Sequence, residues 1–181
     1  MWSGAALLLA SLGLAGQGVP VAEPHVAGVF YYLDQDTEGL IALERQEATE
    51  VTRSKAMGFG GRETAISIPG ARSAVRLPYG KPGAFVFTLD PGTNPYTYVQ
   101  FFRLTVRKDT REVLSTEQVA GGRMANVLNR SQERVRIARH GKLSFKVMLE
   151  GPLAPGEYAL STPTSNVGYC FGVDEPGVEK R

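Results

Sequence analysis

Hydrophobic and polar residues alternate in several short runs between residues 28 and 175. In residues 143–150 every second residue is hydrophobic, namely Leu143, Phe145, Val147 and Leu149. This period of two is typical of a β-strand that buries one face, because successive side chains of a strand point to opposite sides. Runs rich in β-branched and aromatic residues predict further strands at residues 29–33, 85–89, 96–106, 134–137, 157–160 and 169–173.

Turn signals separate these runs. Five Pro-Gly pairs begin at Pro69, Pro82, Pro91, Pro155 and Pro176. Proline sets the backbone for the first central position of a turn, and glycine adopts the positive φ of the second. Short strands at regular spacing predict an all-β fold, an antiparallel immunoglobulin-like β-sandwich of about seven to nine strands with at most one short helix.

Two segments fit this pattern less well. Residues 40–51 (LIALERQEATEV) contain good helix formers, but they follow the strand at residues 29–33 across a six-residue polar turn. We therefore expect a strand there. Residues 117–129 are the second segment, where Gly121 and Gly122 weaken a helix. A helix and a long loop with one helical turn both remain open.

The composition narrows the class of protein. The chain has 181 residues, of which 43% are hydrophobic and 21% charged, as in a globular protein of one domain. Cys170 is the only cysteine, which excludes an internal disulfide framework and a multi-cysteine zinc site. The two histidines, His25 and His140, leave little room for a histidine-rich metal centre. No cofactor is expected.

The first residues resemble a signal peptide. Residues 1–22 carry no charged side chain, and residues 5–15 are an apolar stretch of suitable length. Small residues favour cleavage after Ala15 or Gly18, although no Lys or Arg precedes the apolar stretch. We expect a signal peptide at residues 1–18, an N-terminal extension at 19–27, one sandwich domain at 28–175 and a tail at 176–181. A buried first strand or helix is the alternative. The expected product is secreted, periplasmic or extracellular, and does not span the membrane once the leader is removed.

Basic residues are concentrated in the middle of the chain. Residues 103–146 carry eleven basic and four acidic side chains, whereas residues 23–50 carry one basic and seven acidic side chains. The candidate binding residues are Arg103, Arg107, Arg134, Arg136 and Arg139. If their two strands are neighbours, they form an arginine-rich face for an anionic glycan or a lipid headgroup. The alternatives are solvated arginines paired with acids such as Glu112 and Glu133, or neutralisation by the acidic segments. Nucleic acid is not an expected partner.

Several other chemistries are set aside. The turn at residues 34–39 (DQDTEG) resembles the start of a calcium loop, but Arg45 stands where the bidentate glutamate should be. We expect a solvated hairpin turn with Gly39 at positive φ. His25 lies in an N-terminal stretch and His140 in a turn, and Cys170 lies in an apolar strand where it is expected to be inert. Residues 58–61 (GFGG) lack the Lys-Ser/Thr of a phosphate loop. No catalytic residue is assigned.

Three segments carry a resemblance to a known group of proteins. They are residues 151–160 (GPLAPGEYAL), residues 171–173 (FGV) and residues 68–73 (IPGARS) followed by 75–77 (VRL). The chain resembles uncharacterised exported bacterial proteins with an immunoglobulin-like β-sandwich, a resemblance that implies fold and compartment but no activity. We expect a non-enzymatic structural or binding module of the cell envelope, with an envelope protein or an anionic glycan as partner. The alternatives are a binder of anionic glycans or lipid headgroups and a small hydrolase with unidentified carboxylates.

Overall fold

The computed structural model describes residues 21–55, 61–118 and 122–177. The signal peptide expected at residues 1–18, residues 58–60 of the glycine-rich segment and residues 178–181 of the expected tail lie outside the described residues.

Almost all regular structure is extended. The strands are β1 (Tyr31–Leu33), β2 (Leu40–Ala42), β3 (Glu44–Glu47), β4 (Thr49–Ser54), β5 (Arg62–Pro69), β6 (Arg76–Leu77), β7 (Pro82–Thr88), β8 (Gln100–Arg107), β9 (Thr110–Gln118), β10 (Met124–Asn126), β11 (Val135–Arg139), β12 (Ser144–Pro152), β13 (Gly156–Ser161) and β14 (Val167–Val173). Two 3-10 turns, η2 (Pro95–Thr97) and η3 (Leu128–Ser131), are the helical elements of the described residues.

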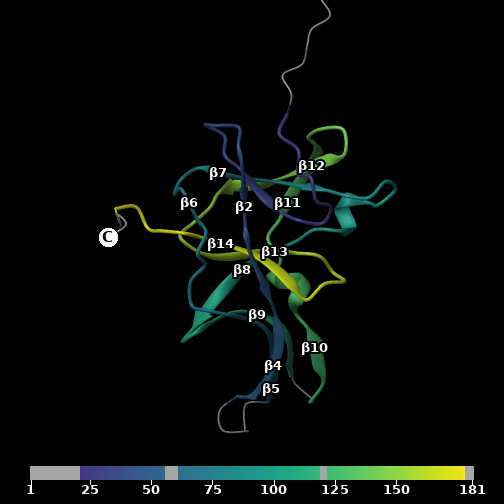
Figure 1. Cartoon of the computed structure of the whole chain (residues 1–181). Helices are drawn as coiled ribbons and strands as arrows, with labels where there is room; N and C mark the ends of the chain where they lie inside the picture. The colour runs from purple at the N-terminus through teal and green to yellow at the C-terminus, as the bar shows by residue number, and fades with distance from the viewer. Residues whose placement is uncertain (1–20, 56–60, 119–121, 178–181) are drawn as a thin grey trace, which may run out of the picture.

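The strands form two sheets. The five-stranded sheet has the order β11-β12-β7-β1-β2, and the nine-stranded sheet has the order β3-β14-β13-β8-β9-β5-β4, with β10 on β9 and β6 on β14. All named strand pairs are antiparallel except β6 with β14. Figure 1 shows β7, β11 and β12 in the upper part of the molecule and β4, β5, β9 and β10 in the lower part. The predicted all-β antiparallel fold of two packed sheets is confirmed.

The strand count differs from the seven to nine predicted, since the described residues contain fourteen strands. Residues 40–54 account for part of this difference. They are extended, as predicted for residues 40–51, but they divide into β2, β3 and β4 because the chain passes from one sheet to the other. The helix considered for residues 117–129 is wrong. Glu117 pairs with Ala125 in the β9–β10 hairpin, and one helical turn, η3, begins at Leu128.

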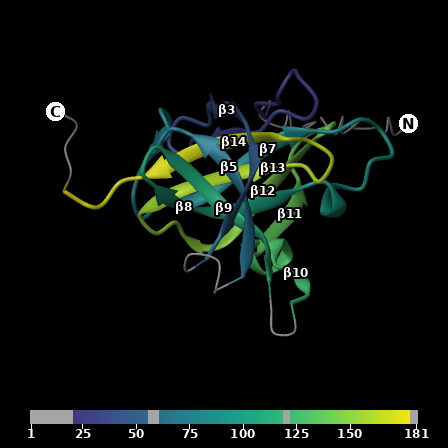
Figure 2. The same cartoon turned by 90° about the horizontal axis from the view of Figure 1, so that it is seen from below.

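The nine-stranded sheet curls back on itself, and we call it the curled sheet. Its edge strands β3 and β4 are consecutive in the chain, joined at Ala48, yet β3 pairs with β14 and β4 pairs with β5. Three strands separate β14 from β5 along the sheet, but a Cβ atom placed on Gly168 of β14 would lie 3.0 Å from Cδ1 of Ile68 on β5. Seen from below, β5 and β9 cross β13 and β14 obliquely (Figure 2).

Residue size on the two faces of β14 explains the direction of the curl. Gly168, Cys170 and Gly172 alternate with Tyr169, Phe171 and Val173. The larger residues belong to the hydrophobic core between the two sheets, whereas Cys170 belongs to a separate cluster with Ile68 and Phe102. Small side chains on one face and large ones on the other favour bending towards the small face. That face is the concave side of the curled sheet.

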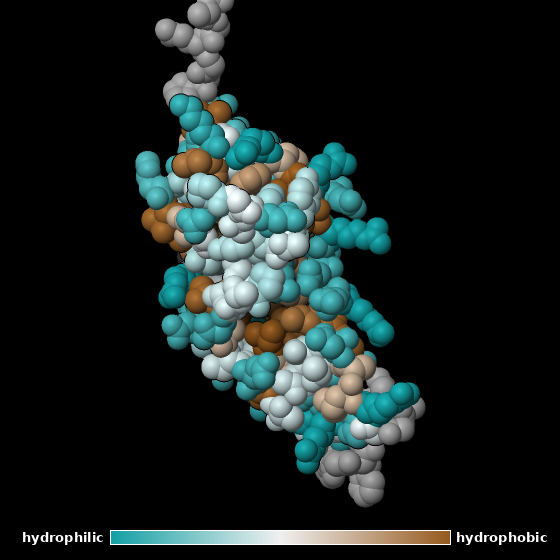
Figure 3. Space-filling view, turned by 90° about the vertical axis from the view of Figure 1, so that its right-hand side faces the viewer, coloured by the Kyte–Doolittle hydropathy of each residue, from teal (hydrophilic) through white to brown (hydrophobic). Residues whose placement is uncertain are grey.

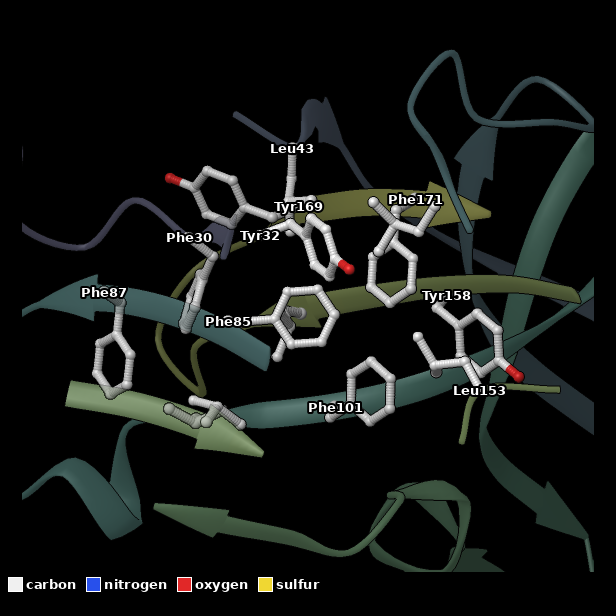
Figure 4. Packing of buried hydrophobic residues seen from close by; sticks show 14 of the residues in the cluster. Phe30, Tyr32, Leu43, Phe85, Phe87, Phe101, Leu153, Tyr158, Tyr169 and Phe171 are labelled. Carbon is white, nitrogen blue, oxygen red and sulfur yellow. The ribbon is translucent and has the colours of Figure 1, made fainter. Parts of the chain in front are cut away.

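The convex side packs against the five-stranded sheet, and we call the buried residues between them the sandwich core. Aromatic rings dominate it. Phe171 lies with its ring centroid 4.9 Å from that of Phe85 and 5.3 Å from that of Tyr158. Phe101 stacks on the same group (Figure 4). Rings of this size supply most of the apolar area that such a core removes from water.

Candidate binding pocket

The five arginines selected from the sequence do not form one face. Arg103 and Arg107 lie on β8 of the curled sheet, whereas Arg136 and Arg139 lie on β11 of the five-stranded sheet. The condition that the two strands are neighbours is therefore not met. Local alternation identifies which residues share a strand face, but it does not identify the sheet to which each strand belongs.

Two of these arginines have local partners, and a third lines a separate pocket. Arg107 lies 3.7 Å from carboxylate oxygens of both Glu63 and Glu112, so the pairing with Glu112 that the sequence suggested is present. The Arg139 guanidinium lies 4.7 Å from the ring centroid of Phe145. Arg136 lies at a shallow pocket that it shares with Met148, Leu149 and Glu150.

Glu112 belongs to an ion-pair cluster on β4, β5 and β9. Arg53 donates to Glu112 and, at 3.1 Å, to Glu63, and Lys55 lies 3.3 Å from Glu63. The hydrogen bond from Arg53 is the main reason that the pKa of Glu112 is lowered. Because each of these carboxylates already has a cationic partner, this cluster offers no obvious position for a charged ligand.

Arg103 and Arg134 do come together. Both line a pocket of about 460 Å³ between the two sheets, which we call the Arg103–Arg134 pocket. Its remaining lining residues are Phe101, Gln132, Glu133, Leu149, Glu150, Gly151, Pro152, Leu153, Ala154 and Tyr158. The segment before β11 reaches β8 because the backbone N–H of Glu133 donates to the carbonyl of Phe101 at 2.8 Å.

Arg103 and Arg134 are both exposed residues of this pocket. Arg103 donates to the backbone carbonyl of Pro155 at 2.9 Å, and its guanidinium carbon lies 6.0 Å from the centroid of the Tyr158 ring. Within the described part of the chain, neither Arg103 nor Arg134 has a carboxylate oxygen within 4 Å. The lining of the pocket therefore includes two arginines, two aromatic residues, the Gln132 amide and the carboxylates of Glu133 and Glu150.

A buried charge network lies at one end of the concave side, and the sequence analysis missed it. Arg111 is fully buried and donates to the carbonyl oxygens of Pro69 at 3.0 Å and Gly70 at 2.9 Å. Its Nη1 atom lies 3.4 Å from Glu44 and 3.6 Å from Glu157. Burial by itself raises the pKa of Glu44, but hydrogen bonds from Ser73, Gln46 and Ala74 and the Arg111 charge bring that pKa below its ordinary value.

The network continues to the surface through Arg76. Arg76 lies 2.5 Å from Glu157 and 2.7 Å from Asp174. A Cβ atom on Gly172 would overlap the ends of the Arg76 and Glu157 side chains, so a larger residue there would displace this pair. Among the described residues, every buried side-chain nitrogen and oxygen has a hydrogen-bond partner. A network that is satisfied internally fixes the fold and presents no open position to a ligand.

The polar turn at residues 34–39, which resembled the start of a calcium loop, is held by its own hydrogen bonds and an ion pair. In the hairpin turn between β1 and β2, Asp34 accepts hydrogen bonds from the Asp36 backbone N–H and the Thr37 hydroxyl, and Asp36 pairs with Lys81. The residue at positive φ in this turn is Glu38 (φ 55°), so the expectation for Gly39 is wrong. No cluster of three or more His, Cys, Asp or Glu side chains suited to a metal ion occurs in the described ranges.

Cys170 and the histidines show no sign of reactivity. Cys170 is fully buried, and burial raises the pKa of its thiol to about 12, so the nucleophilic thiolate is scarce at neutral pH. His140 lies between β11 and β12, as the predicted turn requires, and its Nε2 is 3.1 Å from the carbonyl oxygen of Ala22. His25 lies in the segment before β1 and is exposed.

Glu23 ties the segment before β1 to the turn between β11 and β12. Its carboxylate accepts hydrogen bonds from the backbone N–H groups of Lys142, Leu143 and Ser144 and from the Ser144 hydroxyl. These hydrogen bonds, led by those from the Lys142 and Leu143 backbone, lower the pKa of Glu23 to about 2. The absence of a side chain at Gly141 leaves room for the Glu23 carboxylate, and a Cβ atom there would displace it.

Comparisons with known proteins add no family. No protein-family model matches the chain, and no curated protein or solved structure is significantly similar to it. Of the residues that the structure describes, none belong to a helix with the length and hydropathy needed to cross a lipid bilayer. The resemblance to exported immunoglobulin-like proteins stays a prediction.

Proposed function

We propose that this protein is an exported, non-enzymatic binding module of the cell envelope, and that the Arg103–Arg134 pocket is its binding site for an acidic glycan. The proposal depends on one observation. Two exposed arginines, separated by thirty positions in the chain and held by different segments, line one pocket without a carboxylate partner within 4 Å in the described residues.

The chemistry of the lining supports an anionic sugar. A guanidinium group binds a carboxylate, sulfate or phosphate through paired N–H donors. Glu133 and Glu150 can accept hydrogen bonds from sugar hydroxyls, and the Gln132 amide can both donate and accept. A ligand that combines one anionic group with several hydroxyl groups uses all of these side chains.

Retention on an anionic polysaccharide tests this proposal. We expect the purified protein to bind a polygalacturonate column at low ionic strength and to elute as salt rises, because exposed charge interactions are screened. The double variant R103A/R134A should elute at clearly lower salt. The matched control is R45A/R62A, which removes the same charge from two exposed arginines outside the pocket.

The outcomes separate the alternatives. Equal retention of the two double variants would overturn the site, because the effect would then follow net charge alone. Retention that does not change between low and high salt would overturn the anionic ligand. Binding to vesicles containing phosphatidylglycerol, with no binding to polygalacturonate, would replace the glycan with a lipid headgroup.

Export is tested separately. Expression of the full chain in an export-competent host should yield a protein that lacks about the first 18 residues, as judged by intact mass. A protein of unprocessed mass that is recovered only from the cytoplasm would contradict the predicted leader.

A further inference from the structure

A second pocket lies inside the curled sheet, on the face opposite the sandwich core. It has a volume of about 330 Å³. Its lining residues are Ala48, Thr49, Glu50, Ile66, Ile68, Gln100, Phe102, Leu104, Val113, Leu128, Ala159, Ser161 and residues 162–168. The 162–166 loop lies on the right-hand side of the molecule in Figure 1. Figure 3 shows that side, and hydrophobic residues are visible at the surface in its lower half. We call this the concave pocket.

The inner wall of the concave pocket is hydrophobic. Ile68, Phe102, Leu104, Val113 and Ala159 form one buried cluster with Cys170 and come from four strands that the curl brings together. Ala159 contributes only a methyl group to this wall, and Gly168 has no side chain, which lets Ile68 of β5 approach β14 closely. A hydrocarbon group that lies against this wall is removed from water, which favours its binding.

The rim of the concave pocket is polar. Ser161, Thr162, Thr164 and Ser165 contribute hydroxyl groups, and Gln100 and Asn166 contribute amides. Glu50 is the only charged residue among the lining residues, and it is exposed on β4. A polar group at this rim therefore meets hydrogen-bonding partners and one negative charge, which disfavours an anionic ligand.

We infer that the concave pocket binds a small amphiphile with an amine at its polar end. The hydrocarbon part lies against Ile68, Phe102 and Leu104, and the ammonium group lies at the rim near Glu50. A pocket of this size that combines an apolar wall with polar groups able to orient a ligand is typical of a small-molecule site. The inference depends on the curl of the sheet and on Glu50, and it is independent of the Arg103–Arg134 pocket.

A matched series of three probes tests the inference on the purified protein. Octylamine, 1-octanol and octanoate share a chain length and differ in the charge of the polar end at pH 7. Titration calorimetry at low salt should show octylamine binding about five-fold more tightly than 1-octanol, the size of effect expected for one exposed ion pair. Octanoate should bind most weakly. Failure of octylamine to bind would overturn the inference.

Two substitutions at carboxylates locate the charge effect. E50Q should remove the preference for octylamine over 1-octanol while leaving the affinity for 1-octanol unchanged. The matched control E47Q changes an exposed carboxylate on the preceding strand β3 that does not line the pocket, and it should preserve the preference. An unchanged preference in E50Q would overturn the assignment of the amine to this rim.

Two further substitutions test the position of the hydrocarbon part. A159L should fill the inner pocket, and S161F should block the rim at a half-buried position where a larger side chain is easier to accommodate. Both should lose at least ten-fold in affinity for octylamine. Circular dichroism and thermal unfolding identify the variants that keep the fold. Wild-type affinity in a folded S161F variant would overturn the inference.

Discussion

The two faces of the curled sheet are packed differently, although the same strands form both. The convex face is filled by aromatic rings that lie against the five-stranded sheet. The concave face has small residues along β14, a buried ion network at one end and an open pocket at the other. The comparison indicates that the convex face provides most of the stability, whereas the concave face is where the fold leaves space.

The largest expected effect compares neighbouring residues on opposite faces. Phe171 and Cys170 are both fully buried on β14. F171A should lower the free energy of unfolding by about 3–5 kcal/mol, because it removes a ring from the sandwich core. C170A should lower it by only about 1 kcal/mol, because it removes little more than the volume of one methylene group. Urea denaturation followed by circular dichroism measures both values. Similar losses would contradict the difference between the two faces.

The next effect concerns the buried network on the concave side. R111M removes a fully buried cation and leaves Glu44 and Glu157 without it, so we expect a loss of about 3 kcal/mol in the same measurement. The double variant R111M/E44Q should recover part of this loss, because Glu44 is then neutral and Glu157 keeps its pairing with Arg76. Lys81, a half-buried residue that pairs with the exposed Asp36, provides the control, and K81M should have little effect. A loss in K81M as large as that in R111M would contradict the role of burial.

The smallest expected effect concerns Glu23, a carboxylate outside both faces of the curled sheet. It measures what a hydrogen-bonded, ionised carboxylate contributes to stability. Glu23 has a pKa of about 2 in the folded protein against an ordinary 4.5. A pKa that is lowered by folding adds stability above pH 4.5, and that stability is lost as the pH falls towards 2. The urea midpoints of the wild type and E23Q should therefore differ most near pH 6 and converge near pH 2. A difference that does not depend on pH would exclude the ionised carboxylate as its source.

Local patterns predict the strands well but not their partners. The strand predicted at residues 169–173 is confirmed, and its alternate residues Tyr169, Phe171 and Val173 lie in the sandwich core. The same alternation cannot show that the opposite face of β14 is also enclosed. That enclosure depends on Ile68 of β5, which lies about a hundred residues earlier in the chain.

The same limit of local patterns explains why only two of the five selected arginines belong to the candidate site. All five selected arginines are exposed, as the alternation suggested. Only Arg103 and Arg134 line the same pocket, because Phe101 of β8 accepts a backbone hydrogen bond from Glu133. Arg111 escaped notice because residues 110–118 lack a clear period of two. Arg111 lies two positions before the buried Val113 and therefore on the same face of β9. A charged residue on a buried face is a weak signal for a buried ion network.

In the bent segment formed by β2, β3 and β4, the number of residues between two buried positions is constrained. Leu43 lies in the sandwich core, and Ala48, five positions later, packs on the cluster inside the curled sheet. Deleting or inserting one residue between them would turn each following side chain to the opposite side. Conservative replacements should be tolerated in this segment. A change in its length would displace either Leu43 from the sandwich core or Ala48 from the cluster inside the curled sheet.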